Sequence, residues 1–219
     1  MRIRRKKWVR DELAKCDFFV DDPTLNIGVW HTKFLKEHLL FLELGCGKCS
    51  FIYKIASLNK NINFIAVDIK SEMLGLAKRN IEKEFSFKNL SIKNVLLTAF
   101  DINRISMIFN DKDIVERIYI NFCNPWPKEK HKKRRLTHVR QLMQYRKFLK
   151  TDGEIYFKTD DDLLFKESID YFKEAKFSIT YLTYDLEKSN IPDNIETEHE
   201  KMFKEQGLKI KFLIAKKFD

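Results

Sequence analysis

Short apolar runs alternate with segments of helical spacing from residue 39 onward, and this alternation limits most narrowly what the chain can fold into. The runs Leu39–Leu44, Phe64–Val67 and Arg117–Phe122 have the length and apolar content of buried strands. The segments Ser50–Leu58 and Ser71–Phe85 have the spacing of helices. Short strands joined by helices form parallel sheets with helices on both faces. The sequence therefore predicts an α/β fold with a doubly wound, mostly parallel sheet.

The rest of the chain continues the alternation of strands and helices, except at its C-terminal end. We expect a strand, a helix, a strand and a helix at Ser91–Leu97, Leu136–Leu149, Glu154–Phe157 and Leu163–Ala175. Tyr181–Tyr184 and Ile210–Ala215 then predict two strands with no obvious helix between them. Successive strands of this kind pair as an antiparallel hairpin, which we place at the C-terminal edge of the sheet.

The size and charge of the chain suggest one domain with an anionic partner. The chain has 219 residues, of which 44% are apolar, and no repeat or linker divides it. We therefore expect a single domain over residues 1–219. Its 42 Lys and Arg against 32 Asp and Glu give a net charge of +10, which favours a polyanionic partner. Residues 1–15 are expected to form a basic arm, because six of the first ten residues are Lys or Arg and few are apolar.

The four cysteines, Cys16, Cys46, Cys49 and Cys123, are too few and too unevenly spaced for a disulfide scaffold. Cys46 and Cys49 have no second Cys or His pair at ligand spacing, so we predict no zinc site and treat both thiols as packing residues. The N-terminus lacks a secretory apolar segment, and the longest apolar runs are of strand length. We expect a reduced, cytoplasmic protein that does not cross a membrane.

A glycine pair follows the first predicted strand. Gly45 and Gly47 stand where that strand meets the first helix, which in open α/β sheets is the crevice that binds cofactors. Glycines at this point let the backbone approach a ligand closely. A dinucleotide-binding fingerprint has a third glycine at the position of Ser50, so the spacing disfavours a nicotinamide cofactor.

Three carboxylates accompany the glycine pair. Glu43 lies two residues before the first glycine, Asp68 directly follows the second strand, and Asp101 follows the third. A carboxylate at position 68 can accept both hydroxyls of a ribose, and Asp101 is placed to meet an adenine. These residues favour a methyl-donor nucleotide. Each carboxylate also has a structural alternative. Glu43 could pair with Lys48 or cap a helix, and the two aspartates could each cap a helix.

The stretch Asn121–Lys128 is the most informative one in the chain. Two prolines flank Trp126 at the end of a predicted strand, so the backbone there is stiff and fixes Asn124 beside the cofactor crevice. Trp126 offers a ring on which a base can stack. From Lys128 to Arg135, six of eight residues are Lys or Arg, which fits phosphate contacts along a nucleic acid. The alternative for this run is a solvated charged face.

Further carboxylates follow at two places. Asp160 ends the fifth strand, and Thr197–Glu200 lies between the last two strands. Guanine presents N1–H and its exocyclic amine side by side, and one carboxylate can accept both hydrogen bonds. Asp160 is therefore a candidate guanine-binding residue. Its alternative role is to cap the helix that begins at Leu163, which we expect of at least one residue among Asp160, Asp161 and Asp162.

In this order, the motifs Glu43–Gly47, Asn121–Arg135, Phe157–Asp160 and Thr197–Glu200 resemble those of the bacterial tRNA (guanine-N7-)-methyltransferases over nearly the full chain. The resemblance implies a Rossmann-like fold, S-adenosylmethionine as cofactor and a variable-loop guanine of tRNA as target. It implies a methyl-donor site formed by Glu43, Gly45, Gly47, Asp68, Asp101 and Asn124. It implies that the substrate contacts Lys128, Asp160, Thr197, Glu198, His199 and Glu200, with Asn124 and Asp160 as catalytic residues. RNA would contact Lys130, His131, Lys132, Lys133, Arg134 and Arg135.

Two positions depart from the family pattern, because many members have Asp in place of Asn124 and Glu in place of Asp68. The first departure is compatible with catalysis, since guanine N7 carries a lone pair and no proton and needs no general base. We expect catalysis by alignment of N7 with the sulfonium methyl group and by carboxylates that offset the charge growing on the base. No metal is expected, and the enzyme is expected to be a monomer or homodimer.

Two other functions remain open from the residues alone. Asn124-Pro125-Trp126-Pro127 is similar to the Asn-Pro-Pro-aromatic loop of methyltransferases that modify the amino group of adenine or cytosine, although the order Pro-Trp-Pro fits that loop poorly. The other alternative is a non-catalytic RNA-binding module with a vestigial crevice. The presence of Glu43, the glycine pair and Asp68 argues against it.

Overall fold

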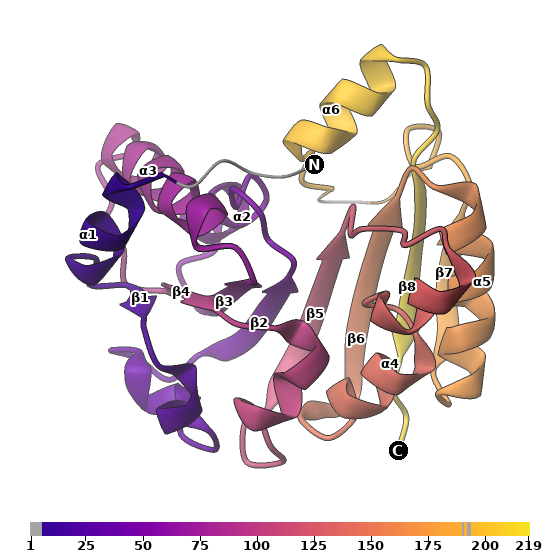
Figure 1. Cartoon of the computed structure of the whole chain (residues 1–219), viewed down its shortest axis with the longest axis horizontal. Helices are drawn as coiled ribbons and strands as arrows, with labels where there is room; N and C mark the ends of the chain where they lie inside the picture. The colour runs from indigo at the N-terminus through magenta and orange to yellow at the C-terminus, as the bar shows by residue number, and fades with distance from the viewer. Residues whose placement is uncertain (1–5, 190, 192–193) are drawn as a thin grey trace.

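The strands form a single sheet. The computed structural model describes residues 6–189, 191 and 194–219. Within them, eight strands follow the order β1-β4-β3-β2-β5-β6-β8-β7 (Figure 1). The strands are β1 (Phe19–Val20), β2 (Leu39–Leu44), β3 (Ile62–Asp68), β4 (Val95–Ala99), β5 (Val115–Asn121), β6 (Leu149–Thr159), β7 (Ser178–Thr183) and β8 (Lys211–Lys216).

The pairing of the strands is parallel except where β8 takes part. β2 lies between β3 and β5, with Leu42 opposite Ile65 on one side and Ile118 on the other. The chain winds outward from β2 in both directions, so its topological switch point lies between β2 and β5. β8 runs antiparallel between β6 and β7, with Phe157 opposite Leu213. The predicted doubly wound sheet and antiparallel C-terminal hairpin are confirmed.

Helices cover the sheet in two groups. Right-handed crossovers in opposite directions from β2 place the two groups on opposite faces. One group is α2 with α3, on which α1 packs, and the other is α4 with α5 and η3 (Figure 1). The α-helices are α1 (Trp8–Ala14), α2 (Ile52–Leu58), α3 (Ser71–Phe87), α4 (Val139–Tyr145), α5 (Asp162–Glu174) and α6 (Glu198–Glu205). The 3₁₀ helices are η1 (Pro23–Asn26), η2 (Trp30–Lys33), η3 (Ile102–Met107) and η4 (Glu129–Arg134).

The central strands carry the core of the molecule. Successive residues of β2, β3 and β5 are buried rather than alternating ones, because both faces of the sheet are covered. Leu42, Ile65 and Ile118 have no exposed surface. This burial explains why the sequence there consists of continuous apolar runs, and it holds the carboxyl ends of the strands in fixed positions.

The N-terminal segment, which the sequence predicts to be a basic arm, forms the helix α1 from Trp8 onward. Val9 and Leu13 of α1 are buried against α3. Gly75 of α3 allows this close approach, since a Cβ atom there would lie 2.7 Å from Val9 Cγ2. The guanidinium of Arg79 also lies 3.6 Å from the ring centroid of Trp8. Residues 1–5 of the predicted arm lie outside the described residues.

Between β7 and β8 the structure has a helix, α6, where the sequence predicts none. Only Met202 and Phe203 among its eight residues are apolar, so the segment offers few apolar positions from which to predict a helix. Phe203 packs against Phe122 with ring centroids 5.7 Å apart. The local signal for this helix is its start, where Thr197 caps the helix three residues before Glu200. No helix in the described part of the chain is long and apolar enough to cross a membrane.

Two predicted boundaries are also wrong. The helix predicted over 136–149 is confined to α4, and Leu149 already belongs to β6. The strand predicted from Ser91 begins at Val95. The residue before β4, Asn94, is tied to the connection between α2 and β3, because its side-chain amide donates hydrogen bonds to the carbonyls of residues 56, 59 and 62.

Candidate active site

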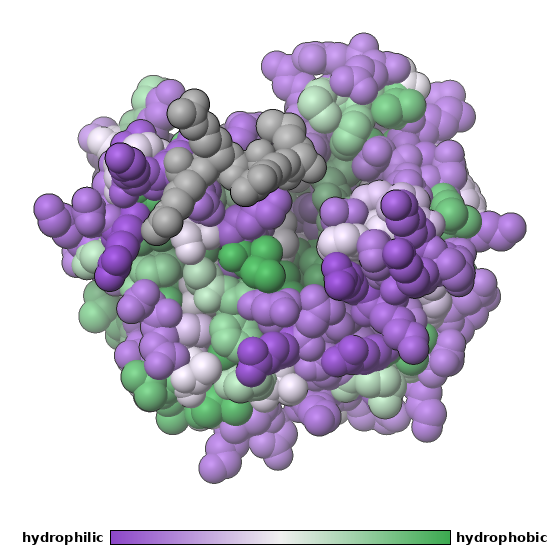
Figure 2. Space-filling view, in the orientation of Figure 1, coloured by the Kyte–Doolittle hydropathy of each residue, from purple (hydrophilic) through white to green (hydrophobic). Residues whose placement is uncertain are grey.

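A cavity of about 800 Å³ opens at the carboxyl ends of β2, β3, β4 and β5. It lies at the switch point of the sheet, where open α/β folds bind ligands. In Figure 2, hydrophilic side chains cover most of the surface around a small hydrophobic area near the centre of the view. The cavity is lined by the predicted site residues Gly45, Gly47, Asp68, Asp101, Asn124, Lys130, Lys133 and Arg134.

The glycine turn forms the floor of this cavity. Gly45 and Gly47 have φ angles of +79° and +54°, which glycine adopts without steric cost. The N–H of Gly47 donates to Asp68 Oδ2 at 2.9 Å, and the N–H of Lys70 donates to Asp68 Oδ1 at 2.8 Å. Asp68 therefore ties the turn to the end of β3. Each of its oxygens keeps a lone pair for a ligand hydroxyl.

Glu43 is buried beneath this turn, with 3% of its surface exposed. Its Oε1 accepts a hydrogen bond from Asn121 Nδ2 at 3.0 Å, whereas Glu43 Oε2 and Asn121 Oδ1 have no partner among the described residues. Burial raises the pKa of Glu43 to about 8, although the hydrogen bond from Asn121 opposes the rise. Glu43 and Asn121 lie outside the cavity lining, so this buried pair sits beneath the glycine turn rather than on the surface that faces the cavity.

Asp101 has the structural role that the sequence offers as its alternative. Its Oδ1 accepts a hydrogen bond from the N–H of Asn103 at 3.0 Å and caps η3. The same oxygen accepts the side-chain amide of Asn103 at 2.9 Å. Asp101 still lines the cavity, so a contact with a nucleotide would come from its other oxygen.

The turn after β5 forms the opposite wall. The Oδ1 of Asn124 accepts a hydrogen bond from the N–H of Trp126 at 3.0 Å. Phe122 and Trp126 have φ angles of +52° and +41°, which large side chains rarely adopt. Such strain persists only where surrounding contacts enforce it, and it is frequent at functional sites. The turn thus holds an amide and an indole ring at the mouth of the cavity.

The basic segment that follows divides into exposed and buried members. Lys133 and Arg134 are exposed and line the cavity, and Arg134 lies 5.3 Å from the ring centroid of Trp126. Lys130 lines the cavity too, whereas Lys128 is exposed outside its lining, and His131 packs edge-on against Trp126.

Lys132 and Arg135 do not share this exposed arrangement. Lys132 forms ion pairs with Glu129 and Glu167 at 2.7 and 2.6 Å. Arg135 is 1% exposed and bonded to Pro125 and Glu167, so its side chain lies in the protein interior rather than on the exposed face where the sequence places an RNA contact. Its Nε and one of its terminal nitrogens already donate within the protein.

Asp160 and its neighbours occupy the carboxyl end of β6. Asp161 caps α5 by accepting a hydrogen bond from the N–H of Leu164 at 2.6 Å, which confirms that one residue of the aspartate cluster is a helix cap. The backbone carbonyl of Asp160 accepts a hydrogen bond from Lys211 Nζ at 2.8 Å. Its carboxylate is half-buried and forms no hydrogen bond or ion pair within the described residues.

Two residues of Thr197–Glu200 are structural. Thr197 is the N-cap of α6, and its Oγ1 accepts a hydrogen bond from the N–H of Glu200 at 3.0 Å. The carboxylate of Glu200 has no exposed surface and pairs with Lys158 Nζ at 3.1 Å. Burial lowers the pKa of Lys158, although its ion pair with Glu200 opposes the change. This buried pair joins α6 to β6.

The other two residues of that segment face outward beside the crevice. Glu198 is half-exposed and lies 3.5 Å from Lys48, which follows the glycine turn. The ring of His199 stacks on Phe122, with centroids 5.9 Å apart. The start of α6 therefore contacts both the glycine turn and the turn after β5 (Figure 1). Glu198 and His199 are the members of this segment that a substrate can reach.

Sequence reasoning missed several residues of the site. Asn121 and Lys158 belong to the sequence motifs without an assigned role, and their signal is a polar residue within an apolar strand. Met73 and Arg140 line the cavity with no sequence signal. Within the described residues, no group of three or more His, Cys, Asp or Glu is arranged to hold a metal ion.

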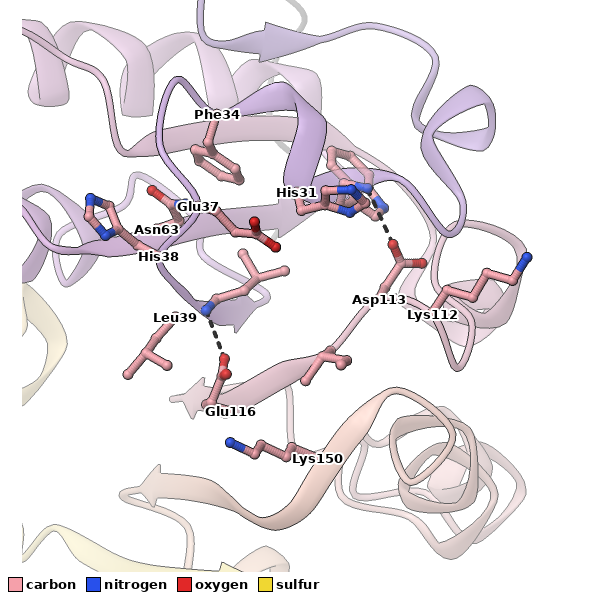
Figure 3. A pocket seen from close by; sticks show the side chains of 13 residues that line it. His31, Phe34, Glu37, His38, Leu39, Asn63, Lys112, Asp113, Glu116 and Lys150 are labelled. Carbon is pink, nitrogen blue, oxygen red and sulfur yellow. Dashed lines mark hydrogen bonds between the residues drawn. The ribbon is translucent and has the colours of Figure 1, made fainter.

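A second pocket, of about 420 Å³, lies at the opposite end of the strands, near the amino ends of β2, β3, β5 and β6 (Figure 3). Two carboxylates in it serve the backbone. Asp113 accepts hydrogen bonds from the N–H groups of Gly28 and Trp30, and Glu116 accepts one from Leu40 at 2.8 Å. This pocket lies away from the switch point and contains none of the motif residues.

Comparison with known proteins identifies the fold and the family. The family model described as "Putative methyltransferase" matches residues 37–213. Among solved structures, the 16S rRNA methyltransferase KamB has a TM-score of 0.58 at 13% identity, covering 81% of this chain and 87% of that one. An antibiotic-related methyltransferase has a TM-score of 0.57 at 16% identity, covering 81% of this chain and 86% of that one. Fold and site define a methyltransferase of the Rossmann-like class.

The sequence relatives are more specific. The tRNA (guanine-N(7)-)-methyltransferase of Clostridium beijerinckii is 61% identical over 99% of both chains. That of Clostridium botulinum (strain Eklund 17B) is 59% identical over the full length of both. The chain belongs to the tRNA (guanine-N7-)-methyltransferase family. The family and the fold imply the use of S-adenosylmethionine.

Proposed function

We propose that this chain transfers a methyl group from S-adenosylmethionine to N7 of a guanine in the variable loop of tRNA. One observation carries the proposal. The glycine turn tied by Asp68 and the Asn124–Trp126 turn with its exposed cations face the same cavity. A nucleotide cofactor and an RNA base can therefore meet there. The names and identities of the relatives support the same reaction.

The cofactor side of the cavity fits S-adenosylmethionine. The cofactor carries an ammonium and a sulfonium, and Glu43, buried beneath the glycine turn and outside the cavity lining, has one carboxylate oxygen without a partner among the described residues. Asp68 has free lone pairs for ribose hydroxyls, and the backbone at Gly45 and Gly47 permits close approach. When bound, the cofactor supplies an activated methyl group.

The chain's own residues have to orient the base rather than activate it. Guanine N7 has a lone pair and no proton, so no general base is needed. We assign Trp126 to stacking on the base and the free carboxylate of Asp160 to its N1–H and amino edge. Asp160 would also offset the positive charge that grows on the base. Lys130, Lys133 and Arg134 would contact the RNA backbone.

The test is methyl transfer to total tRNA with a labelled methyl donor, followed by nucleoside digestion and mapping of the modified position. We expect 7-methylguanosine in the variable loop. A product of N6-methyladenosine or N4-methylcytidine would support the amino-group alternative, which the Asn124-Pro125 sequence suggests. Absence of cofactor binding by calorimetry, together with retained tRNA binding, would indicate an RNA-binding module instead.

A further inference from the structure

Arg135 differs from the neighbouring cations in where its side chain goes. It is 1% exposed, whereas Lys133 and Arg134 are exposed. Its Nε donates a hydrogen bond to the carbonyl oxygen of Pro125 at 2.7 Å. One terminal nitrogen donates to the carboxylate of Glu167 and lies 3.4 Å from the hydroxyl of Tyr171. Arg135 therefore joins the turn after β5 to α5.

Glu167 is the anchor on the α5 side. One of its oxygens accepts Lys132 Nζ at 2.6 Å, and the other accepts Arg135. Partial burial by itself would raise the pKa of Glu167, but these hydrogen bonds hold it below its ordinary value. The carboxylate is thus ionised at neutral pH. It fixes the buried guanidinium, which would be costly to leave unpaired in the interior.

The carbonyl that Arg135 holds lies at the centre of the strained turn. Pro125 stands between Asn124, whose side chain bonds to the N–H of Trp126, and Trp126 itself, which has a positive φ angle. The Asn124 bond closes the turn from within, and the Arg135 bond holds it from the protein interior. Without the second bond, the left-handed backbone at Trp126 is free to relax toward an ordinary conformation.

We propose that Arg135 is a positioning residue, which acts through the Pro125 carbonyl to hold Asn124 and Trp126 in register with the cofactor side of the cavity. The inference rests on the proposed function, because its consequence is a slower methyl transfer. It separates two adjacent arginines by role. Arg134 contacts RNA, whereas Arg135 aligns the turn on which the base would lie.

The test compares Arg135→Gln with the matched variant Arg134→Gln. For Arg135→Gln we expect kcat at saturating tRNA to fall by about 10- to 100-fold, since small misplacements of reacting groups cost rates of this order. Its tRNA affinity and the salt dependence of that affinity should stay as in the parent. Arg134→Gln should weaken tRNA binding and flatten the salt dependence by roughly 0.7 to 0.9 log units. Amide exchange in the peptide 121–128 should accelerate only in Arg135→Gln.

Two milder variants keep the test decisive if Arg135→Gln does not fold. Glu167→Gln preserves shape and should lower kcat in the same direction but less. Arg135→Lys keeps the charge without the guanidinium fork, so it should recover only part of the rate. A flattened salt dependence in the Arg135 variants, or an unchanged kcat in all of them, would overturn the inference. A parent protein that methylates no tRNA would instead contradict the proposed function.

Discussion

The Oδ1 atom of Asp161 lies 2.6 Å from the backbone nitrogen of Leu164, so the helix cap beside the candidate site belongs to Asp161. Its neighbour Asp160 is released from that role. The Asp160 carboxylate forms no hydrogen bond or ion pair within the described residues, and its backbone carbonyl is held by Lys211. Of the two adjacent aspartates, one therefore has a structural role, and the other keeps a carboxylate that is available for the proposed contact with guanine.

Asp160→Asn should slow methylation of tRNA by about 10²-fold or more, because the substitution replaces an acceptor with an amide donor that faces the donors of guanine. Folding and cofactor affinity should change little. Steady-state rates on tRNA and a thermal melt measure both quantities. Near-normal turnover would move guanine recognition to Glu198, the exposed carboxylate at the start of α6.

Asp161→Ala is the matched control for that variant. Loss of the cap should lower the free energy of unfolding by on the order of 1 kcal/mol. The folded fraction should still methylate tRNA at close to the parent rate per molecule, because the Asp161 carboxylate is bonded to the backbone of α5 and is assigned no contact with the substrate. If both variants lost activity and stability together, the separation of roles would be wrong.

Asp68→Ala should weaken cofactor binding by roughly 1.5–3 kcal/mol, the range for a hydrogen bond to a charged group. The loss combines the proposed ribose contacts with the bond that ties Gly47 to β3. Affinity for tRNA should be spared, since Asp68 lies on the glycine side of the cavity. Calorimetry with cofactor and filter binding with tRNA check the two expectations, and an unchanged cofactor dissociation constant would remove Asp68 from the site.

Replacing Lys130, Lys133 and Arg134 by Ala should weaken tRNA binding and flatten its salt dependence by roughly 0.7 to 0.9 log units for each phosphate that the variant no longer neutralises. The matched control replaces Lys33, Lys36 and Lys60, which are exposed and precede the amino ends of β2 and β3. It removes the same charge and should leave the slope nearly unchanged. Equal slopes in the two variants would show that only net charge matters.

The stability of the free protein should depend on pH through Glu43. Its pKa is about 8 in the folded chain against 4.5 for the ordinary group, chiefly because it is buried. The unfolded chain therefore releases this proton at lower pH than the folded chain. Below about pH 4.5, Glu43 is protonated in both states and does not change the free energy of unfolding. That free energy then falls as pH rises to about 8.

Glu43→Gln removes that titration and should stabilise the free protein increasingly between about pH 5 and 8, by on the order of a few kcal/mol at the upper end. Urea unfolding of parent and variant at both pH values gives the difference. An equal difference at the two pH values would mean that Glu43 is already ionised. Above about pH 8, where Glu43 is ionised, cofactor binding should also be weaker in the variant, because Gln offers no negative charge to the methyl donor.

The sequence by itself determined how the main strands and helices follow one another along the chain, and where the candidate site lies. Continuous apolar runs such as Leu39–Leu44 can be buried only in a sheet that is covered on both faces, and alternation with helices makes that sheet parallel. Gly45, Asp68 and Asn124 each stand at or just after the end of such a strand, so the pattern alone places them at one edge. These conclusions depend on local periodicity, which a single sequence displays directly.

The tertiary structure alone decided which polar residues remain free to act. Arg134 and Arg135 are alike in the sequence, yet the chain buries one against Glu167 and leaves the other exposed. Asp160 and Asp161 differ in the same way. The helix α6 has few apolar residues, and Phe203 and the buried Glu200 find their partners at the ends of β5 and β6 only after folding. Burial and pairing are properties of contacts between distant segments, and no local pattern encodes them.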